Sequence, residues 1–259
     1  MRIKGIDVSR YQGDIDWRAV AADGIEFAMI KALQGQSAVD KRFLQNAQGA
    51  QAAGIPFGVY VYSKAKTADE ARAEALAAID LTDGFTLRYP VALDVESAHF
   101  REMESGLLAD IINAFCSEIK SSGLMPIIYS NKDWLTNVIP EDCSRRWDVW
   151  LAQWRKSDPD YQGPYTMWQY GRGEVAGVSG KVDMDICFVG YPKLAESARP
   201  LVFRVTTPRM KGDAVLKMQL ALIAANYTDA TGTPLAPDGV WGPKSQAALD
   251  KLINAQSER

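Results

Sequence analysis

The chain has 259 residues, of which 47% are hydrophobic and 24% charged, and its net charge is −3. This composition is that of a folded globular protein and excludes a largely disordered chain. The small negative charge argues against a protein that coats nucleic acid, so we expect no nucleic-acid partner.

Short runs rich in β-branched and aromatic residues alternate with segments of helical period along the first two thirds of the chain. Eight strands are predicted at residues 3–9, 26–33, 56–63, 89–96, 125–130, 147–154, 165–170 and 181–188. Four helices are predicted at residues 16–24, 41–54, 67–81 and 104–123. The third begins after Thr67, a typical N-cap, and the fourth ends at Gly123, a typical C-terminal stop.

This alternation predicts βαβ units and a parallel sheet. The fold class we expect is α/β: an irregular TIM-like barrel of five βα units followed by three further strands. An open doubly wound sheet is the alternative, although no G-x-G-x-x-G or phosphate-binding loop supports nucleotide binding. After about residue 195 the pattern changes to two helical segments, 211–227 and 242–254, separated by a turn-rich stretch. We therefore expect a catalytic barrel over residues 1–195 and a small all-α domain over residues 196–259.

Carboxylates follow or end several of the predicted strands. Asp94 and Glu96 are two residues apart in "LDVES", so in a strand their side chains point the same way. Asp7 ends the first strand, and Asp183 or Asp185 belongs to the last. Because active sites of such barrels gather at the carboxyl ends of the strands, these acids are expected to share one mouth. Crowding raises the pKa of at least one carboxyl, which can then act as a general acid in glycosidic bond cleavage.

Aromatic residues at or near the strand ends support a sugar substrate, although most such residues fill cores. They are Tyr11, Tyr60, Tyr62, Tyr129, Trp150, Trp154, Trp168 and Tyr170. Three carboxylates could instead hold Mg²⁺ or Ca²⁺, but the chain has no calcium-loop spacing. His99 is the only histidine, which excludes a multi-histidine metal site. Cys116, Cys143 and Cys187 have no paired spacing and predict reduced, buried thiols.

The motifs "GIDVSRYQGDIDW", "ALDVES", "VWLAQW", "MWQY" and "SGKVDMDICF", in this order over residues 3–190, resemble glycoside hydrolase family 25, the lysozyme-type N-acetylmuramidases. The resemblance implies an irregular αβ barrel that uses neither a cofactor nor a metal. It implies that Glu96 is the proton donor, Asp94 its partner, and Asp7 and Asp183 the flanking acids. The substrate contacts that we expect are Tyr60, Tyr62, Tyr129, Trp168 and Asp185.

The sequence departs from the family pattern at two positions. The family often has asparagine where Asp185 stands, which leaves open whether Asp183 or Asp185 faces the cleft. Many members have histidine where Val61 stands. The C-terminal segment, with "MKGDAVLKMQLAL" and "DGVWGPKSQAALDKL", resembles a peptidoglycan-binding domain. Gly239 and Gly242 are expected to allow positive φ in its turn, and Trp241 to anchor its core. An uncommitted helical cap or a dimerisation segment is the alternative.

The expected function is hydrolysis of the β-1,4 bonds between N-acetylmuramic acid and N-acetylglucosamine in peptidoglycan, by a monomer. A non-catalytic wall-binding protein and a metal-dependent hydrolase are the rivals. The first residues show no signal-peptide pattern, and no segment approaches the ~20 apolar residues of a membrane helix. We therefore expect no membrane insertion, and synthesis in the cytoplasm followed by release through a holin-type pore, as for an endolysin, or by dedicated secretion.

Overall fold

The computed structural model describes residues 1–193, 203, 205, 207 and 209–257. The chain divides into two compact units, residues 1–199 and 200–259. The boundary expected between residues 195 and 196 lies outside the described residues. In the part of the chain that is described, no helix is both long and apolar enough to cross a membrane.

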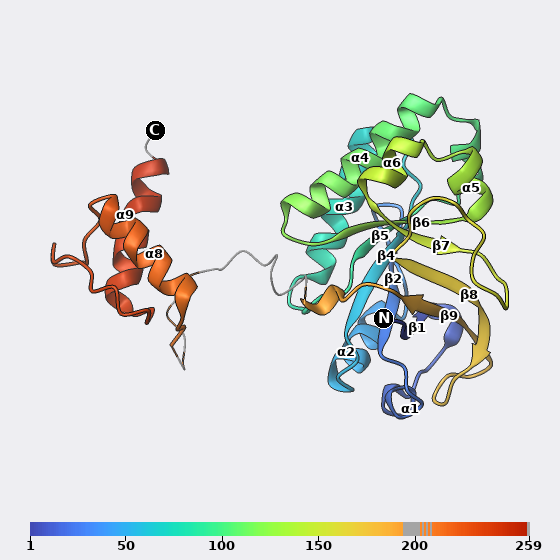
Figure 1. The fold of residues 1–259 in the computed structure, drawn as a ribbon, viewed down its shortest axis with the longest axis horizontal. Coiled ribbons are helices and arrows are strands. Elements are labelled where there is room, and N and C mark those ends of the chain that lie inside the picture. Colours follow the sequence, from blue (N-terminus) through green and yellow to red (C-terminus); the bar gives the residue numbers. More distant parts are fainter. Residues whose placement is uncertain (194–202, 204, 206, 208, 258–259) are drawn as a thin grey trace. The chain divides into compact units, whose positions relative to one another are not determined.

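Eight strands of the larger unit close into a barrel (Figure 1). They are β1 (Ile3–Val8), β2 (Phe27–Gln34), β4 (Phe57–Tyr62), β5 (Val91–Asp94), β6 (Pro126–Asn131), β7 (Asp148–Ala152), β8 (Met167–Glu174) and β9 (Lys181–Cys187). The ring is closed because β1 pairs with β2 on one side and with β9 on the other. A two-residue strand, β3 (Ala38–Val39), extends from β2 outside the ring. The predicted barrel is confirmed.

Strand direction decides which residues reach the same mouth. Strands β1, β2 and β4 to β8 run parallel to their neighbours, whereas β9 is antiparallel to both β8 and β1. The mouth at the carboxyl ends of the parallel strands therefore receives the beginning of β9. Asp183, near the start of β9, pairs directly with Asp7, near the end of β1.

Helices pack on the outside of part of the barrel (Figure 1). The four predicted helices are α1 (Trp17–Ala22), α2 (Phe43–Ala52), α3 (Ala68–Thr82) and α4 (Ser105–Ser121), and α3 packs beside α4. Thr67 caps α3 as predicted, because its hydroxyl accepts the Glu70 N–H at 3.2 Å. Two helices were not predicted: α5 (Lys132–Asn137) and α6 (Glu141–Arg146) follow β6. Six residues are too few to show a helical period in the sequence.

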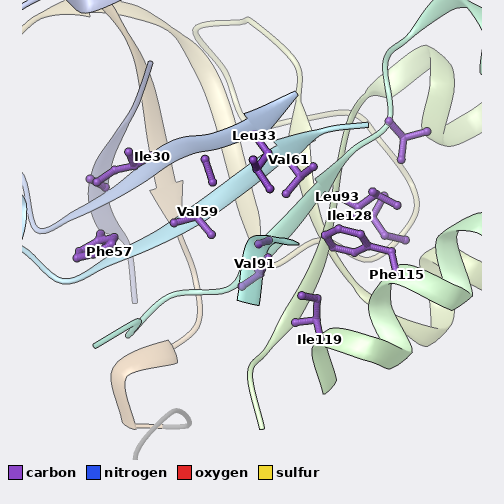
Figure 2. Packing of buried hydrophobic residues seen from close by; sticks show 14 of the residues in the cluster. Ile30, Leu33, Phe57, Val59, Val61, Val91, Leu93, Phe115, Ile119 and Ile128 are labelled. Carbon is purple, nitrogen blue, oxygen red and sulfur yellow. The ribbon is translucent and has the colours of Figure 1, made fainter. Parts of the chain in front are cut away.

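Strand alternation separates the core into two layers. Outward-facing strand residues such as Ile30, Val59 and Leu93 belong to a layer that also contains helix residues. Phe115 and Ile119 of α4 are two of these helix residues (Figure 2). The inward-facing layer contains Phe27, Met29, Tyr89, Ala92, Ile127, Trp150, Met167, Cys187 and Tyr191. Burial of one large apolar side chain stabilises a fold by about 1.5–3 kcal/mol. The stability of the barrel therefore rests on these two layers, and polar side chains can occupy its mouth.

The smaller unit has a core of its own, built around α8 (Asp213–Ala224) and α9 (Pro243–Ser257). Trp241 is completely buried there, as predicted. Gly239 has a φ of 67°, also as predicted. The same expectation for Gly242 was wrong, since its φ is not positive. Gly242 directly precedes Pro243, and a residue before proline is driven towards the extended region with negative φ.

Candidate active site

Four carboxylates lie together at the barrel mouth. Asp7, Asp94, Glu96 and Asp183 line two adjoining hollows of about 440 and 270 Å³, which form one cleft. Asp94 ends β5, and Glu96 follows two residues later on the same side of the chain. The juxtaposition arises because a closed parallel barrel brings the ends of distant strands to one mouth.

Asp94 and Glu96 lie in different environments. Asp94 is only 3% exposed, and its Oδ1 has no hydrogen-bond partner. Burial, and then the charge of Glu96, raises the pKa of Asp94 well above its usual range. Glu96 is partly open to solvent at the lip of the cleft. Reduced hydration still raises its pKa, and the positive charge of Lys31 opposes that rise. The pair thus holds a protonated carboxyl to higher pH than free side chains would.

Asp7 is a buried acid of the cleft wall. Its Oδ2 accepts a hydrogen bond of 2.8 Å from Gln169 Nε2. Burial, followed by repulsion from Asp183, raises the pKa of Asp7 to about 7, while the hydrogen bond from Gln169 opposes the rise. Gln169 was not recognised in the sequence, because an amide in the middle of a strand has no distinctive spacing.

Asp183, and not Asp185, faces the cleft. Asp183 lines both hollows, and its Oδ1 forms an ion pair with Arg172 Nε at 2.7 Å. Asp185 points into the barrel at the level of Gly5, one inward-facing pair below Asp7 and Asp183. It is completely buried and lines neither hollow. The structure therefore does not place Asp185 among the groups that a substrate could reach, contrary to our expectation.

Of the four aromatic residues expected to contact substrate, three line the cleft. Tyr60 borders both hollows, Tyr62 one and Tyr129 the other. Trp168 does not: it belongs to the outer core layer, and its Nε1–H donates to the Gln153 carbonyl at 2.8 Å. The reason is strand alternation, because the neighbouring Gln169 faces inward and Trp168 must then face the outside of the barrel.

Two exposed aromatic side chains form the rim of the cleft. Tyr11 is 77% exposed and borders the larger hollow, while Trp154 is 55% exposed and borders the smaller one. Trp154 is fixed in place, because its Nε1–H donates to Gln169 Oε1 at 2.9 Å and Arg172 lies over its ring at 5.0 Å. An exposed, immobilised aromatic ring beside a polar cleft is suited to a sugar face.

Cations also line the cleft, and sequence reasoning missed them. Lys31 is 8% exposed, and its Nζ lies 4.9 Å from the centre of the Tyr62 ring. Lys64 approaches the same ring at 4.7 Å and donates to Ser97 Oγ at 3.0 Å. One signal was available: Lys31 follows Phe27 and Met29 at two-residue spacing in a strand, so its side chain had to point into the barrel.

His99 supports the site from outside the cleft. Its Nδ1 is hydrogen-bonded to Ser97 Oγ at 2.9 Å, and its Nε2 to the Ala65 carbonyl at 3.1 Å. His99 thereby orients the hydroxyl that receives Lys64. In the described part of the chain, no three histidine, cysteine or acidic side chains come together in a way that could hold a metal ion.

Comparison with known proteins agrees with this geometry. The family model of glycosyl hydrolases family 25 matches residues 6–178, a segment that contains Asp7, Asp94 and Glu96. The autolytic lysozyme of Clostridium acetobutylicum is 27% identical over 252 residues, covering 95% of this chain and 71% of that protein. Lysozyme M1 of Streptomyces globisporus is 33% identical over 201 residues, covering 70% of this chain and 66% of that protein.

Solved structures show the same barrel. The bacterial lysozyme of Streptomyces coelicolor superimposes with a TM-score of 0.62 at 28% identity, over 76% of this chain and 97% of that one. The family match covers most of the barrel, and the cleft acids lie at the ends of its strands. The chain belongs to glycosyl hydrolases family 25.

Proposed function

We propose that this protein is a lysozyme of the muramidase type, which hydrolyses the β-1,4 bond between N-acetylmuramic acid and N-acetylglucosamine in peptidoglycan. The observation that carries the proposal is the pairing of Glu96 with Asp94 at the mouth of a closed barrel, with both pKa values raised. The family membership and the relatives named as lysozymes support it.

Glu96 is the general acid in this proposal. It is the member of the pair that is open to solvent, so its carboxyl can reach the oxygen of a bound glycosidic bond. Its raised pKa keeps the proton available to higher pH than a free glutamate would, and transfer of that proton releases the leaving sugar. Asp7 and Asp183, on the opposite wall, supply negative charge that stabilises the oxocarbenium-like transition state.

Asp94 is the partner whose role decides the reaction course. Asp94 borders both hollows of the cleft, and no donor of the protein reaches its Oδ1. An N–H of the substrate's acetamido group that donates to the Asp94 carboxyl would turn the acetamido oxygen towards the anomeric carbon. We therefore favour substrate assistance over direct attack by Asp94. In that course the acetamido oxygen forms a bond to the anomeric carbon as the leaving oxygen takes the proton from Glu96, and water later opens the ring.

The decisive experiment for the activity is Glu96→Gln assayed on purified peptidoglycan. Loss of a general acid costs ~10²–10⁴-fold in rate, so release of reducing ends should fall by that factor. Glu102→Gln, the same substitution at an exposed position that lines neither hollow, is the matched control and should retain the wild-type rate. Equal rates for the Glu96→Gln and wild-type proteins would refute the assignment and favour a wall-binding protein without turnover.

The course of the reaction is tested separately by NMR of the first-formed anomer. Substrate assistance passes through two displacements and should give the β-anomer of the new reducing end. An α-anomer would refute it and assign a single displacement by water.

The smaller unit is proposed to bind peptidoglycan and to keep the barrel on its insoluble substrate. Support comes from its compact core around Trp241 and from the similarity to the Clostridium acetobutylicum lysozyme, which extends over 95% of the chain and so beyond the barrel. The test is cosedimentation with cell walls in the Glu96→Gln background, which prevents digestion. The full chain should sediment, and a chain ending at residue 195 should stay largely in solution.

We further propose that the enzyme reaches the wall by endolysin-like release through a holin-type pore or by dedicated secretion. Peptidoglycan lies outside the cytoplasmic membrane, so an enzyme made in the cytoplasm must cross that membrane before it can act. Bacteria that express the protein in the cytoplasm should keep their turbidity until a holin is co-expressed, and should then lyse. Lysis without the holin would contradict this route.

A further inference from the structure

Asp185 is a buried carboxyl that has no role in the proposed reaction. It is completely buried, on the inward face of β9. Its Oδ1 accepts a 2.8 Å hydrogen bond from Trp150 Nε1, and its Oδ2 has no N–H donor. The neighbouring carboxyl, one inward-facing position along the β1–β9 register, belongs to another acid, Asp7. Two carboxylates in contact away from water cannot both stay ionised.

In the part of the chain that the structure describes, the groups found to influence Asp185 include no positive charge that would offset its own. The titratable groups close enough to act on its charge, or to feel it, are Asp7 from β1, Asp183 and Cys187 from β9, Tyr129 from β6 and Tyr170 from β8. Each of these groups is neutral when protonated and negative when deprotonated, so none of them can compensate a negative charge on Asp185. Among the described residues, no lysine or arginine forms an ion pair with Asp185. Burial, and then the charge of Asp7, raises the pKa of Asp185 well above its usual range.

The position of the pair in the barrel decides which member keeps the proton. Asp7 lines the cleft and also receives the Gln169 amide at 2.8 Å, which stabilises its charged form. Asp185 lies deeper in the barrel, at the level of Gly5, and its Oδ2 has no hydrogen-bond donor. A proton on that second oxygen satisfies it, because the resulting O–H donates to Asp7.

We propose that Asp185 is a neutral carboxylic acid at working pH and a positioning residue, whose O–H donates to Asp7 and, with the Gln169 amide, holds Asp7 as the single anion of the pair facing the cleft. Asp7 then accepts two hydrogen bonds, one from the Asp185 O–H and one from the Gln169 amide. A carboxylate fixed in this way needs no reorganisation when positive charge develops on the substrate. The kinetic part of this inference rests on the proposed muramidase function.

The protonation state can be tested without any activity assay. In the infrared difference spectrum of wild type minus Asp185→Asn at pH 7, we expect the carbonyl stretch of a protonated carboxylic acid. A difference that contains only carboxylate bands would overturn the proposal, whether or not the protein is a muramidase. Asp142→Asn, an exposed position, serves as the control and should give carboxylate bands only.

The positioning role is tested by two substitutions of Asp185. Asp185→Asn is isosteric and keeps an N–H donor towards Asp7, so kcat should stay within about threefold of wild type, with an unchanged pH profile. Asp185→Leu removes the donor, so kcat should fall at least tenfold while KM changes little. The acid limb of its profile should move to higher pH, because Asp7 loses a hydrogen bond that lowers its pKa.

Two outcomes would overturn the positioning role. A loss of more than about thirtyfold in Asp185→Asn would mean that a charge at this position is needed. Full activity in Asp185→Leu would mean that the contact with Asp7 does nothing. If Asp185→Leu does not fold, because Trp150 loses its acceptor, the Asn variant and the infrared measurement still decide.

Discussion

Gln169 Nε2 donates a 2.8 Å hydrogen bond to Asp7 Oδ2, across the strand that separates β8 from β1. The other atom of the same amide, Oε1, accepts from Trp154 Nε1 at 2.9 Å and from the Tyr129 hydroxyl at 3.3 Å. One side chain therefore connects an acid of the cleft wall, an aromatic ring on the rim and a tyrosine of the cleft floor. Its amide orientation is fixed by these partners.

Replacement of Gln169 by methionine should shift the acid limb of the pH–rate profile to higher pH. Methionine fills a similar volume but donates no hydrogen bond, so the pKa of Asp7, already raised to about 7, should rise further. A hydrogen bond to a charged group is worth ~1.5–3 kcal/mol, so kcat/KM below pH 7 should fall roughly tenfold or more. Gln153→Met, a nearby amide that does not contact Asp7, is the control. An unmoved acid limb would show that Gln169 does not tune Asp7.

Replacement of Lys31 by methionine should shift the alkaline limb of the pH–rate profile to higher pH. Lys31 lowers the pKa of both Asp94 and Glu96, so its removal raises them. A general acid of higher pKa keeps its proton to higher pH, so activity should extend further into the alkaline range. Methionine can occupy the space of the buried lysine stem. Lys66→Met, an exposed change, should leave the limb in place. A limb that stays or moves down would contradict the role of Lys31.

The pKa of Asp7 also predicts how barrel stability depends on pH. Its folded-state pKa of about 7 lies above the ordinary value of 3.8, so the folded state holds a proton that the unfolded chain releases. The resulting stability is present below about pH 4 and is lost as the pH rises to 7. A shift of about three units corresponds to an upper bound of ~4 kcal/mol.

Urea unfolding at pH 4.5 and pH 7.5 measures this effect. Asp7→Asn cannot bind the proton, so its free energy of unfolding should fall less between the two pH values than that of wild type. Asp142→Asn, at an exposed position, should follow wild type. If the free energy of unfolding of Asp7→Asn falls as much between pH 4.5 and pH 7.5 as that of wild type, a group other than Asp7 holds the proton.

Trp154 is expected to bind sugar, because it is 55% exposed yet fixed by Gln169 and Arg172. Trp154→Ala should raise KM for a soluble glycan roughly twofold to twelvefold with a small change in kcat, since an aromatic contact is worth about 0.5–1.5 kcal/mol. Trp154→Phe should keep most of the affinity. Leu76→Ala removes an exposed apolar side chain from α3 and should leave KM unchanged. A wild-type KM for Trp154→Ala would remove this residue from the binding surface.

The sequence predicted the barrel because strand and helix periods alternate over most of it, and it located Asp7, Asp94 and Glu96 because they stand at or just after strand ends. It did not show that β9 runs antiparallel, since residue alternation is the same in both directions. For this reason the choice between Asp183 and Asp185 needed the register of β9 against β1. Trp168 was misplaced because an aromatic residue in a strand serves equally well on either face.

The smaller unit should be sensitive to one buried amide, that of Gln219. Its Nε2 lies 2.9 Å from Asp238 Oδ1 and 3.1 Å from the Val240 carbonyl, and its Oε1 accepts the Gly239 N–H at 2.9 Å. Gln219 is 1% exposed, so Gln219→Leu would leave these turn groups buried without partners, at a cost of ~1–3 kcal/mol each. A unit of about 60 residues has little stability to lose.

Gln219→Leu should therefore unfold the smaller unit while the barrel stays folded. The variant should release reducing ends from a soluble glycan at the wild-type rate but cosediment with cell walls much more weakly. Lys217→Leu places the same residue on the exposed side of α8 and should bind walls normally. Wild-type wall binding by a Gln219→Leu protein whose smaller unit has melted would show that the barrel alone holds the enzyme on its substrate.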